Sequence, residues 1–161
     1  SYVVNATNLT ATDSIRELTI IHAPEQAPQY LVPDGQGGWT NLPPDRLETP
    51  FAGSDFLVSD LGLEFLHWPV QKILKREVHR SCGCTVLEST NPHPGPQGYA
   101  RVVAWIDTDS LGIVEAYAYD AAGRKLKDFY PKLIGQRQEQ TLVMENLQTD
   151  TRTRLELKLK P

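Results

Sequence analysis

The sequence predicts a mainly β protein with minor α content, in which sequential antiparallel strands form a meander that curls into an open or closed barrel. Short β-branched and aromatic runs alternate with clusters of Gly, Pro, Asn and Asp, which are typical of turns. The C-terminal run alternates between apolar and charged residues, as a half-buried strand does. Only residues 53–69 carry apolar side chains at helical spacing.

The first strands are expected between residues 17 and 42. Residues 18–21 and 29–32 are short β-rich runs, and the glycine-rich segment 34–38 is typical of a hairpin that returns into residues 39–42. Prolines at 43, 44 and 50 then indicate a loop. The first dozen residues are polar and weakly patterned, so we assign no element to them.

The second half of the chain predicts a longer series of strands. Residues 71–88 form two strands with a turn near Arg80 and Ser81, and the proline-rich segment 91–98 is a loop because its prolines cannot donate to a ladder. The remaining strands are expected at residues 99–107, 113–119, 125–134, 139–145 and 152–160, with a Gly123 hairpin between the second and third of these.

The last strand shows the clearest alternation. Its apolar series is expected to face the core, while the intervening Arg, Glu and Lys side chains face water. Leu142 and Met144 of the preceding strand alternate less sharply and are expected on the same inner face. The inner series of the last strand consists of Thr153, Leu155, Leu157 and Leu159.

The segment 53–69 predicts a short apolar helix that starts at Ser59 or Asp60 and ends before Pro69. A curled sheet with one apolar face needs a cover, and this helix is a candidate for one. Simple core packing explains the segment equally well. In a cover, Asp60 and Glu64 are expected in water, with the apolar side chains underneath.

Composition limits the classes of function. The chain has 161 residues, enough for one domain, with a net charge of −4 and a pI near 5.5. This charge gives no general attraction to nucleic acid or anionic lipid. The apolar runs are too short to cross a membrane.

The candidates for chemistry are few. His79, Cys82 and Cys84 have the side chains of a zinc or copper site, with His67 as the nearest fourth ligand, but their spacing matches no standard metal module. Two buried thiols are the alternative. The carboxylates at 55, 60 and 64 suit a cap and turns better than acid–base catalysis, and the three tryptophans suit a core. We therefore expect no enzyme and no cofactor.

A series of stretches in a fixed order resembles the outer-membrane lipoprotein-sorting proteins, the LolA-like family. The resemblance runs from about Trp39 to the C-terminus, and the order of the stretches carries it rather than any single motif. They are GSDFLVSDL at 53–61, FLHWP at 65–69, CTVLEST at 84–90, YARVVAWID at 99–107, AYDAAGRKLK at 118–127 and TRTRLEL at 151–157.

This resemblance implies an incomplete, half-open antiparallel β-barrel with a short helical lid over its concave apolar face, as a single domain over residues 1–161. A signal segment, a lipidation cysteine and the family's N-terminal helix are not visible, so we expect the chain to start after them. The implied function is non-enzymatic binding of acyl chains or lipoproteins, in the periplasm or at the outer membrane, by a monomer. The lid and lipid-binding residues would be Leu61, Phe65, Leu66, Trp68, Leu142, Met144, Leu155, Leu157 and Leu159.

Two alternatives remain beside this interpretation. One is an envelope interaction module whose core is filled by its own side chains and which binds a protein partner instead of a lipid. Inward-facing Ala104, Ala116 and Ala118 would leave room for a ligand. Inward-facing Trp105, Tyr117 and Tyr119 would fill it instead. The other alternative is the metal site described above.

Overall fold

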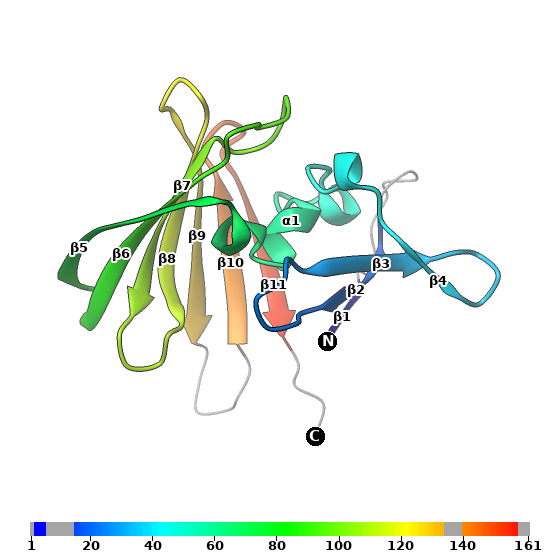
Figure 1. Cartoon of the computed structure of the whole chain (residues 1–161), viewed down its shortest axis with the longest axis horizontal. Helices are drawn as coiled ribbons and strands as arrows, with labels where there is room; N and C mark the ends of the chain where they lie inside the picture. Colours follow the sequence, from blue (N-terminus) through cyan, green and yellow to red (C-terminus); the bar gives the residue numbers. More distant parts are fainter. Residues whose placement is uncertain (1, 6–14, 134–139, 158–161) are drawn as a thin grey trace. The chain divides into compact units, whose positions relative to one another are not determined.

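The computed structural model describes residues 2–5, 15–133 and 140–157, and the chain divides into two compact units, residues 1–67 and 68–161. Each unit contains one antiparallel sheet (Figure 1). The prediction of a mainly β fold with little helix is confirmed. The strands nevertheless divide between two sheets instead of forming one continuous meander. The single domain over residues 1–161 stays a prediction.

The first unit begins with a four-stranded sheet in which each strand pairs antiparallel with the next. Sequence patterning found three of these strands and missed the first, because its residues are few and weakly patterned. The four strands are β1 (Tyr2–Asn5), β2 (Glu17–Ile21), β3 (Gln29–Pro33) and β4 (Trp39–Asn41).

Alternation and turn chemistry explain the strands of this sheet. Leu18 and Ile20 lie two residues apart in β2 and are fully buried, as inward-facing strand positions are. The hairpin between β3 and β4 is closed by Asp34, whose Oδ1 accepts hydrogen bonds from the amides of Gln36 and Gly38, each at 2.8 Å. These bonds lower the pKa of Asp34.

Short helices follow: the 3-10 helices η1 (Pro44–Arg46) and η2 (Phe51–Gly53), then α1 (Val58–Leu61) and the 3-10 helix η3 (Glu64–His67). The predicted helix start at Ser59 or Asp60 is wrong. Leu57 is the N-cap residue, and the Asp60 carboxylate accepts a hydrogen bond from the Leu57 amide at 2.7 Å. Leu63, with a φ of 52°, separates α1 from η3.

The second unit is a seven-stranded sheet in the order β11-β10-β9-β8-β7-β6-β5, antiparallel throughout and not closed, so it forms an open half-barrel. Every strand predicted for this half of the chain is present. Their bounds are β5 (Val70–His79), β6 (Cys82–Thr90), β7 (Arg101–Asp107), β8 (Ile113–Tyr119), β9 (Lys125–Leu133), β10 (Gln140–Asn146) and β11 (Thr151–Leu157).

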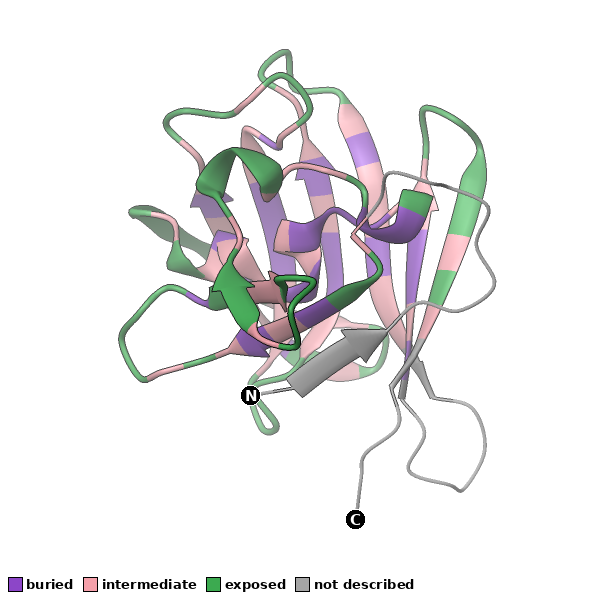
Figure 2. Ribbon diagram, turned by 90° about the vertical axis from the view of Figure 1, so that its right-hand side faces the viewer, coloured by how far each residue is buried: buried purple, intermediate pink, exposed green. Residues whose placement is uncertain are grey.

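Turns and bulges shape this half-barrel. Arg80 and Ser81 both have positive φ, 47° and 66°, and join β5 to β6 in two residues, as the predicted turn requires. Register shifts interrupt the pairs β5–β6, β7–β8 and β8–β9, and such bulges increase local twist. Buried residues recur along most strands, and the hairpin loops are largely exposed, but β4 and most of β5 are exposed too (Figure 2).

Candidate functional site

One face of the seven-stranded sheet carries an apolar row that crosses every strand. Each member of the row is the direct antiparallel partner of the next, so all of them point to the same face. We call this side the apolar face. The row consists of Ile73, Leu87, Ala104, Ala116, Phe129, Met144 and Thr153.

The centre of the row is made of small side chains. Ala104 is 0% exposed and Ala116 is 3% exposed, and larger side chains of Leu87 and Phe129 flank them. Ala118 belongs to the same face and is also buried. Trp105 points to the opposite face, because successive residues of a strand alternate. Of the two sets that the sequence left open, the alanines therefore share the face with the apolar row.

A more polar row borders the apolar row along the same face. Gln71 pairs with Ser89, which pairs with Val102, and Lys127 and Asn146 continue the row. The Ser89 hydroxyl, fully buried, donates to Gln71 Oε1 at 2.7 Å. The apolar row therefore has a polar boundary on one side, which would limit how far an apolar ligand extends.

The predicted inner residues of the last two strands lie on this face. Leu142 is the direct partner of Leu155, and Met144 is the direct partner of Thr153. Arg152 and Arg154, which alternate with Thr153 and Leu155 along β11, are exposed, in agreement with the predicted alternation. The backbone of Leu157 pairs with β10, and Leu159 lies outside the described residues. Their role in binding lipid stays a prediction.

The predicted lid residues belong to α1, η3 and the start of the second unit. Leu61 and Phe65 are buried, and Leu66 and Trp68 are half-buried. The expectation that Glu64 faces water is wrong, because its Oε2 accepts a hydrogen bond from the Tyr30 hydroxyl at 2.8 Å.

Gly62 allows this contact between Tyr30 and the short helices. A Cβ at Gly62 would lie 2.1 Å from the Tyr30 oxygen, so no other residue fits without moving the phenol. The sequence signal for this constraint was a glycine inside a helical pattern. The ring of Tyr30 is buried and so ties η3 to the first unit's sheet.

The opposite side of the seven-stranded sheet, which we call the charged face, carries a row of very different chemistry. Direct pairing again connects all seven strands. This row consists of Lys72, Glu88, Val103, Tyr117, Asp128, Glu145 and Arg152. Apart from Lys72, its charged members are paired locally: Glu88 with Arg101 at 2.9 Å, Asp128 with Lys125 at 3.0 Å, and Glu145 with Arg152.

A buried carboxylate organises the charged face. The Glu115 side chain is only 4% exposed and contacts His79 Nε2 and the guanidinium of Arg80, the latter at 2.7 Å. His79 stacks on Trp105 at 4.6 Å between ring centroids, and the Trp105 indole donates to Glu77 at 2.8 Å. The predicted core position of the tryptophans is therefore wrong for Trp105, whose indole is half-buried among charged groups, and for Trp39, which is 44% exposed.

The pKa values of two neighbouring carboxyl groups on this face move in opposite directions. Burial favours a raised pKa for Glu115, but the hydrogen bonds and charges of His79 and Arg80 outweigh it and lower the pKa. For Asp128, burial dominates over the Lys125 contact and raises the pKa. Burial, with the neighbouring carboxylates, also raises the pKa of Tyr117 to about 12.

The metal-site alternative finds no support in this geometry. Among the residues that the structure describes, no group of three or more His, Cys, Asp or Glu side chains is arranged to hold a metal ion. His79 Nε2 contacts Glu115, and the Cys84 thiol is buried, with its sulfur 3.5 Å from the Cys82 carbonyl oxygen. Both cysteines are free thiols, and burial raises the pKa of Cys84.

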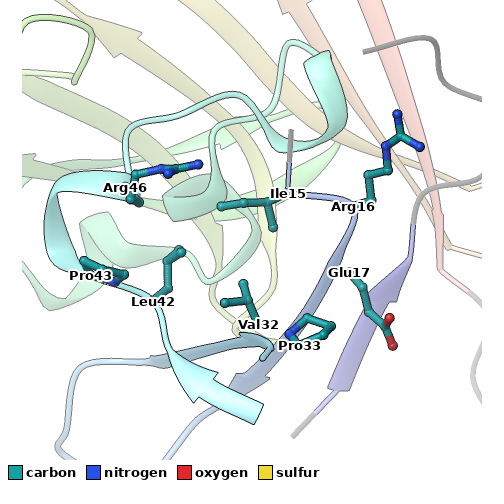
Figure 3. Close-up of a pocket in the computed structure, with 8 residues that line it drawn as sticks. All are labelled: Ile15, Arg16, Glu17, Val32, Pro33, Leu42, Pro43 and Arg46. Atoms are coloured by element: carbon teal, nitrogen blue, oxygen red, sulfur yellow. The ribbon is translucent and has the colours of Figure 1, made fainter. Parts of the chain in front are cut away.

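The first unit contains a cavity of about 580 Å³ that the sequence did not predict (Figure 3). Its lining is mainly apolar, and the guanidinium of Arg46 points toward Ile15 across it. The lining comes from separated segments, and no local motif marks it. The lining residues are Ile15, Arg16, Glu17, Val32, Pro33, Leu42, Pro43 and Arg46.

The open half-barrel has the same fold as solved structures of LolA-like proteins. A family model described as "Uncharacterized protein" matches residues 16–159, and the chain belongs to this family. No curated protein matches the chain. The described residues contain no helix of the length and apolar character that a membrane crossing requires.

Three solved structures are similar to the chain. An outer membrane lipoprotein-sorting protein domain from Vibrio parahaemolyticus has 23% identity and a TM-score of 0.62, over 80% of this chain and 57% of its own. A DUF1329 family protein from Desulfovibrio piger has 18% identity and a TM-score of 0.60, over 89% and 64%. A LolA superfamily protein from Nitrosomonas europaea has 17% identity and a TM-score of 0.56, over 99% and 77%.

These similarities confirm the predicted resemblance to the LolA-like proteins, and what the chain shares with the three structures is the fold. The chain spans less than two thirds of the length of the first two, 57% and 64%.

Proposed function

We propose that the protein binds acyl chains, carried by lipids or lipoproteins, on the apolar face of its half-barrel and acts as a non-enzymatic carrier in the bacterial envelope. The observation that supports this proposal is the continuous apolar row with alanines at its centre. In the bound state the acyl chain would lie along these small side chains, and each methylene buried there would contribute about 0.8 kcal/mol.

The similar proteins support the same class of ligand. One of the solved structures is described as an outer membrane lipoprotein-sorting protein domain, and another as a LolA superfamily protein. We extend the acyl-binding function and the envelope location to this chain as proposals. Lipoproteins are the proposed cargo, and the proposed working state is a monomer.

In this proposal, residues 57–68 are the lid over the acyl chain. Leu61 and Phe65 are apolar and buried, and α1 and η3 are each only four residues long. Such short helices have little stability of their own, so a lid made of them can open at low cost. Leu66 and Trp68, both half-buried, would complete its apolar side.

The experiment measures binding of a fluorescent fatty acid to the purified protein, alongside native mass spectrometry for co-purified lipid. In the test variant Ala104→Val, added methyl groups occupy the space on the apolar row. The matched control is Val103→Ile, which adds a methyl group to the next residue on the charged face. We expect the first variant alone to lose about tenfold in fatty-acid affinity. Absence of lipid binding by the wild type would favour the interaction module with a filled core.

A further inference from the structure

The strand β5 exposes large apolar side chains along the edge of the seven-stranded sheet. Ile73 is 63% exposed and Val78 is 77% exposed, and Val70 and Leu74 are at least 42% exposed. The described residues contain seven exposed large hydrophobic side chains, and β5 holds four of them. An apolar concentration of this kind on one exposed strand is typical of an interaction site.

Two cationic side chains accompany the apolar ones. Lys72 and Arg76 form no ion pair within the described residues, whereas Lys75 pairs with Glu77 at 2.7 Å. The strand therefore carries two cations that form no ion pair of their own: Lys72 lies on the charged face opposite Glu88, and Arg76, beyond the bulge, lies on the apolar face opposite Thr85. A partner that matches β5 needs apolar residues and acidic residues in an extended arrangement.

The backbone of β5 is available on one side. In the described part of the chain, β5 pairs only with β6 and ends the sheet. The outer row of amide and carbonyl groups on such an edge strand can pair with an added strand, and β5 is ten residues long. Strand addition would also cover the exposed apolar side chains.

We propose that the outer edge of β5 binds an extended acidic and apolar peptide segment of a protein partner, which adds to the half-barrel as an eighth strand. Pairing between two copies of β5 is opposed by their like charges. Insertion into a bilayer would leave the edge backbone without hydrogen-bond partners. An acidic strand supplies hydrogen-bond partners for the edge backbone and opposite charges for the two cations.

The experiment uses two fluorescein-labelled eight-residue peptides, one alternating Val with Glu and the other alternating Val with Lys. Fluorescence anisotropy at low salt measures their affinity for the wild type and for the double variant Lys72→Glu, Arg76→Glu. We expect the wild type to prefer the acidic peptide. The double variant should bind it about tenfold more weakly or worse and should prefer the basic peptide. Arg154→Glu on β11, the other edge, is the matched control and should leave both affinities unchanged.

Hydrogen exchange measured with the acidic peptide separates strand addition from non-specific charge attraction. Slower exchange of the amides of residues 70–79 is expected, together with unchanged fatty-acid affinity in the double variant. Equal binding of both peptides, protection elsewhere in the chain, or a dimer held by β5 without peptide would overturn the proposal. Binding of anionic phosphatidylglycerol vesicles, without peptide binding, would overturn it in favour of a membrane surface. Failure of lipid binding by the wild type would leave this proposal standing.

Discussion

The apolar and charged faces of the seven-stranded sheet are built on the same strands, yet they organise their side chains in different ways. The row through Ala104 and Phe129 has small residues at its centre and no charged member. The row through Tyr117 and Asp128 is covered by its own ion pairs and stacked rings, including Lys125, whose Nζ lies 3.2 Å from the Tyr117 ring centre.

Under the proposed function, this difference determines which face receives the acyl chain. On the charged face, long side chains fold over the sheet and satisfy one another, so Val103 and Glu115 are buried beneath them. On the apolar face, the alanines are too short to cover their neighbours, and at 0% and 3% exposed Ala104 and Ala116 are themselves covered by other residues, which would have to move to admit a ligand. A face that is covered by its own side chains is closed to ligands, whereas a face of small apolar groups can accept an acyl chain.

The largest expected effect comes from a charge on the apolar row. Ala104→Lys places an ammonium group at a fully buried position without an acidic partner in its row, and we expect a loss of about 3–5 kcal/mol of stability or failure to fold. The adjacent Val103→Lys faces Glu88 and Tyr117 on the charged face and should cost about 1–2 kcal/mol. Urea denaturation of both variants measures the difference. Equal losses would mean that the two faces do not differ in their tolerance of charge.

A smaller loss of stability is expected from substitutions in the proposed lid. Truncation of a large side chain in a tight core costs about 3–5 kcal/mol. If residues 57–68 open to admit a ligand, Phe65→Ala and Trp68→Ala should each cost less, about 2–3 kcal/mol, and should change fatty-acid binding.

Thermal unfolding and fatty-acid binding are measured on the same samples of the lid variants. Leu18→Ala, at a fully buried position of β2, is the control that should show the full core cost without a specific effect on binding. Gross destabilisation by the lid variants, with fatty-acid affinity unchanged in the folded fraction, would show that the segment is simply core.

The hydrogen bonds to Glu115 are expected to contribute about 2 kcal/mol to the stability of the folded protein, and this contribution depends on pH. The pKa of Glu115 is lowered in the folded protein, so its contribution to stability is present above about pH 4.5 and is lost as the pH falls through the folded pKa. Glu115→Gln should therefore destabilise at pH 7 and have little effect at acid pH.

For Asp128, we expect stability to change with pH in the opposite direction. Its folded pKa is raised above the ordinary value of 3.8, so the wild type loses stability as the pH rises from 3.8 through the folded pKa. Asp128→Asn removes this loss and should be relatively more stable at pH 7 than at pH 4. Urea denaturation across this range measures both variants. Parallel pH profiles for the two would contradict the assigned directions of the pKa shifts.

The sequence predicted the strands of the half-barrel well because each one carries local signals. Period-two alternation places Leu155 and Thr153 on one face, and Asp120 with Gly123 defines a hairpin. The division into two sheets could not be predicted, because strand pairing is a long-range property that alternation does not encode. The missed β1 is only four residues long, which is too short for alternation to be recognised.

The candidate site was predictable only in part for the same reason. Leu142 and Met144 were assigned to the inner face by alternation, but the alanine centre of the row depends on the register of four strands. The Glu115 cluster joins β8 to His79 at the end of β5 and to Arg80 in the following turn, which lie 36 and 35 residues earlier in the sequence. Neither charge pattern nor spacing along the chain indicates such a contact.

The smallest expected effect tests how the charged face is held together. Arg152 and Glu145 form an ion pair at the solvent-exposed end of the charged row, and the arginine side chain is 61% exposed. Exposed ion pairs contribute little because water and salt screen them, so Arg152→Ala should cost less than about 1 kcal/mol, and the cost should shrink further in 0.5 M salt. Thr153→Ala, the next residue and a member of the apolar row, is the control whose effect should not depend on salt. A loss well above 1 kcal/mol that persists in high salt would mean that the outer ion pairs, and not the buried Glu115 cluster, stabilise this face.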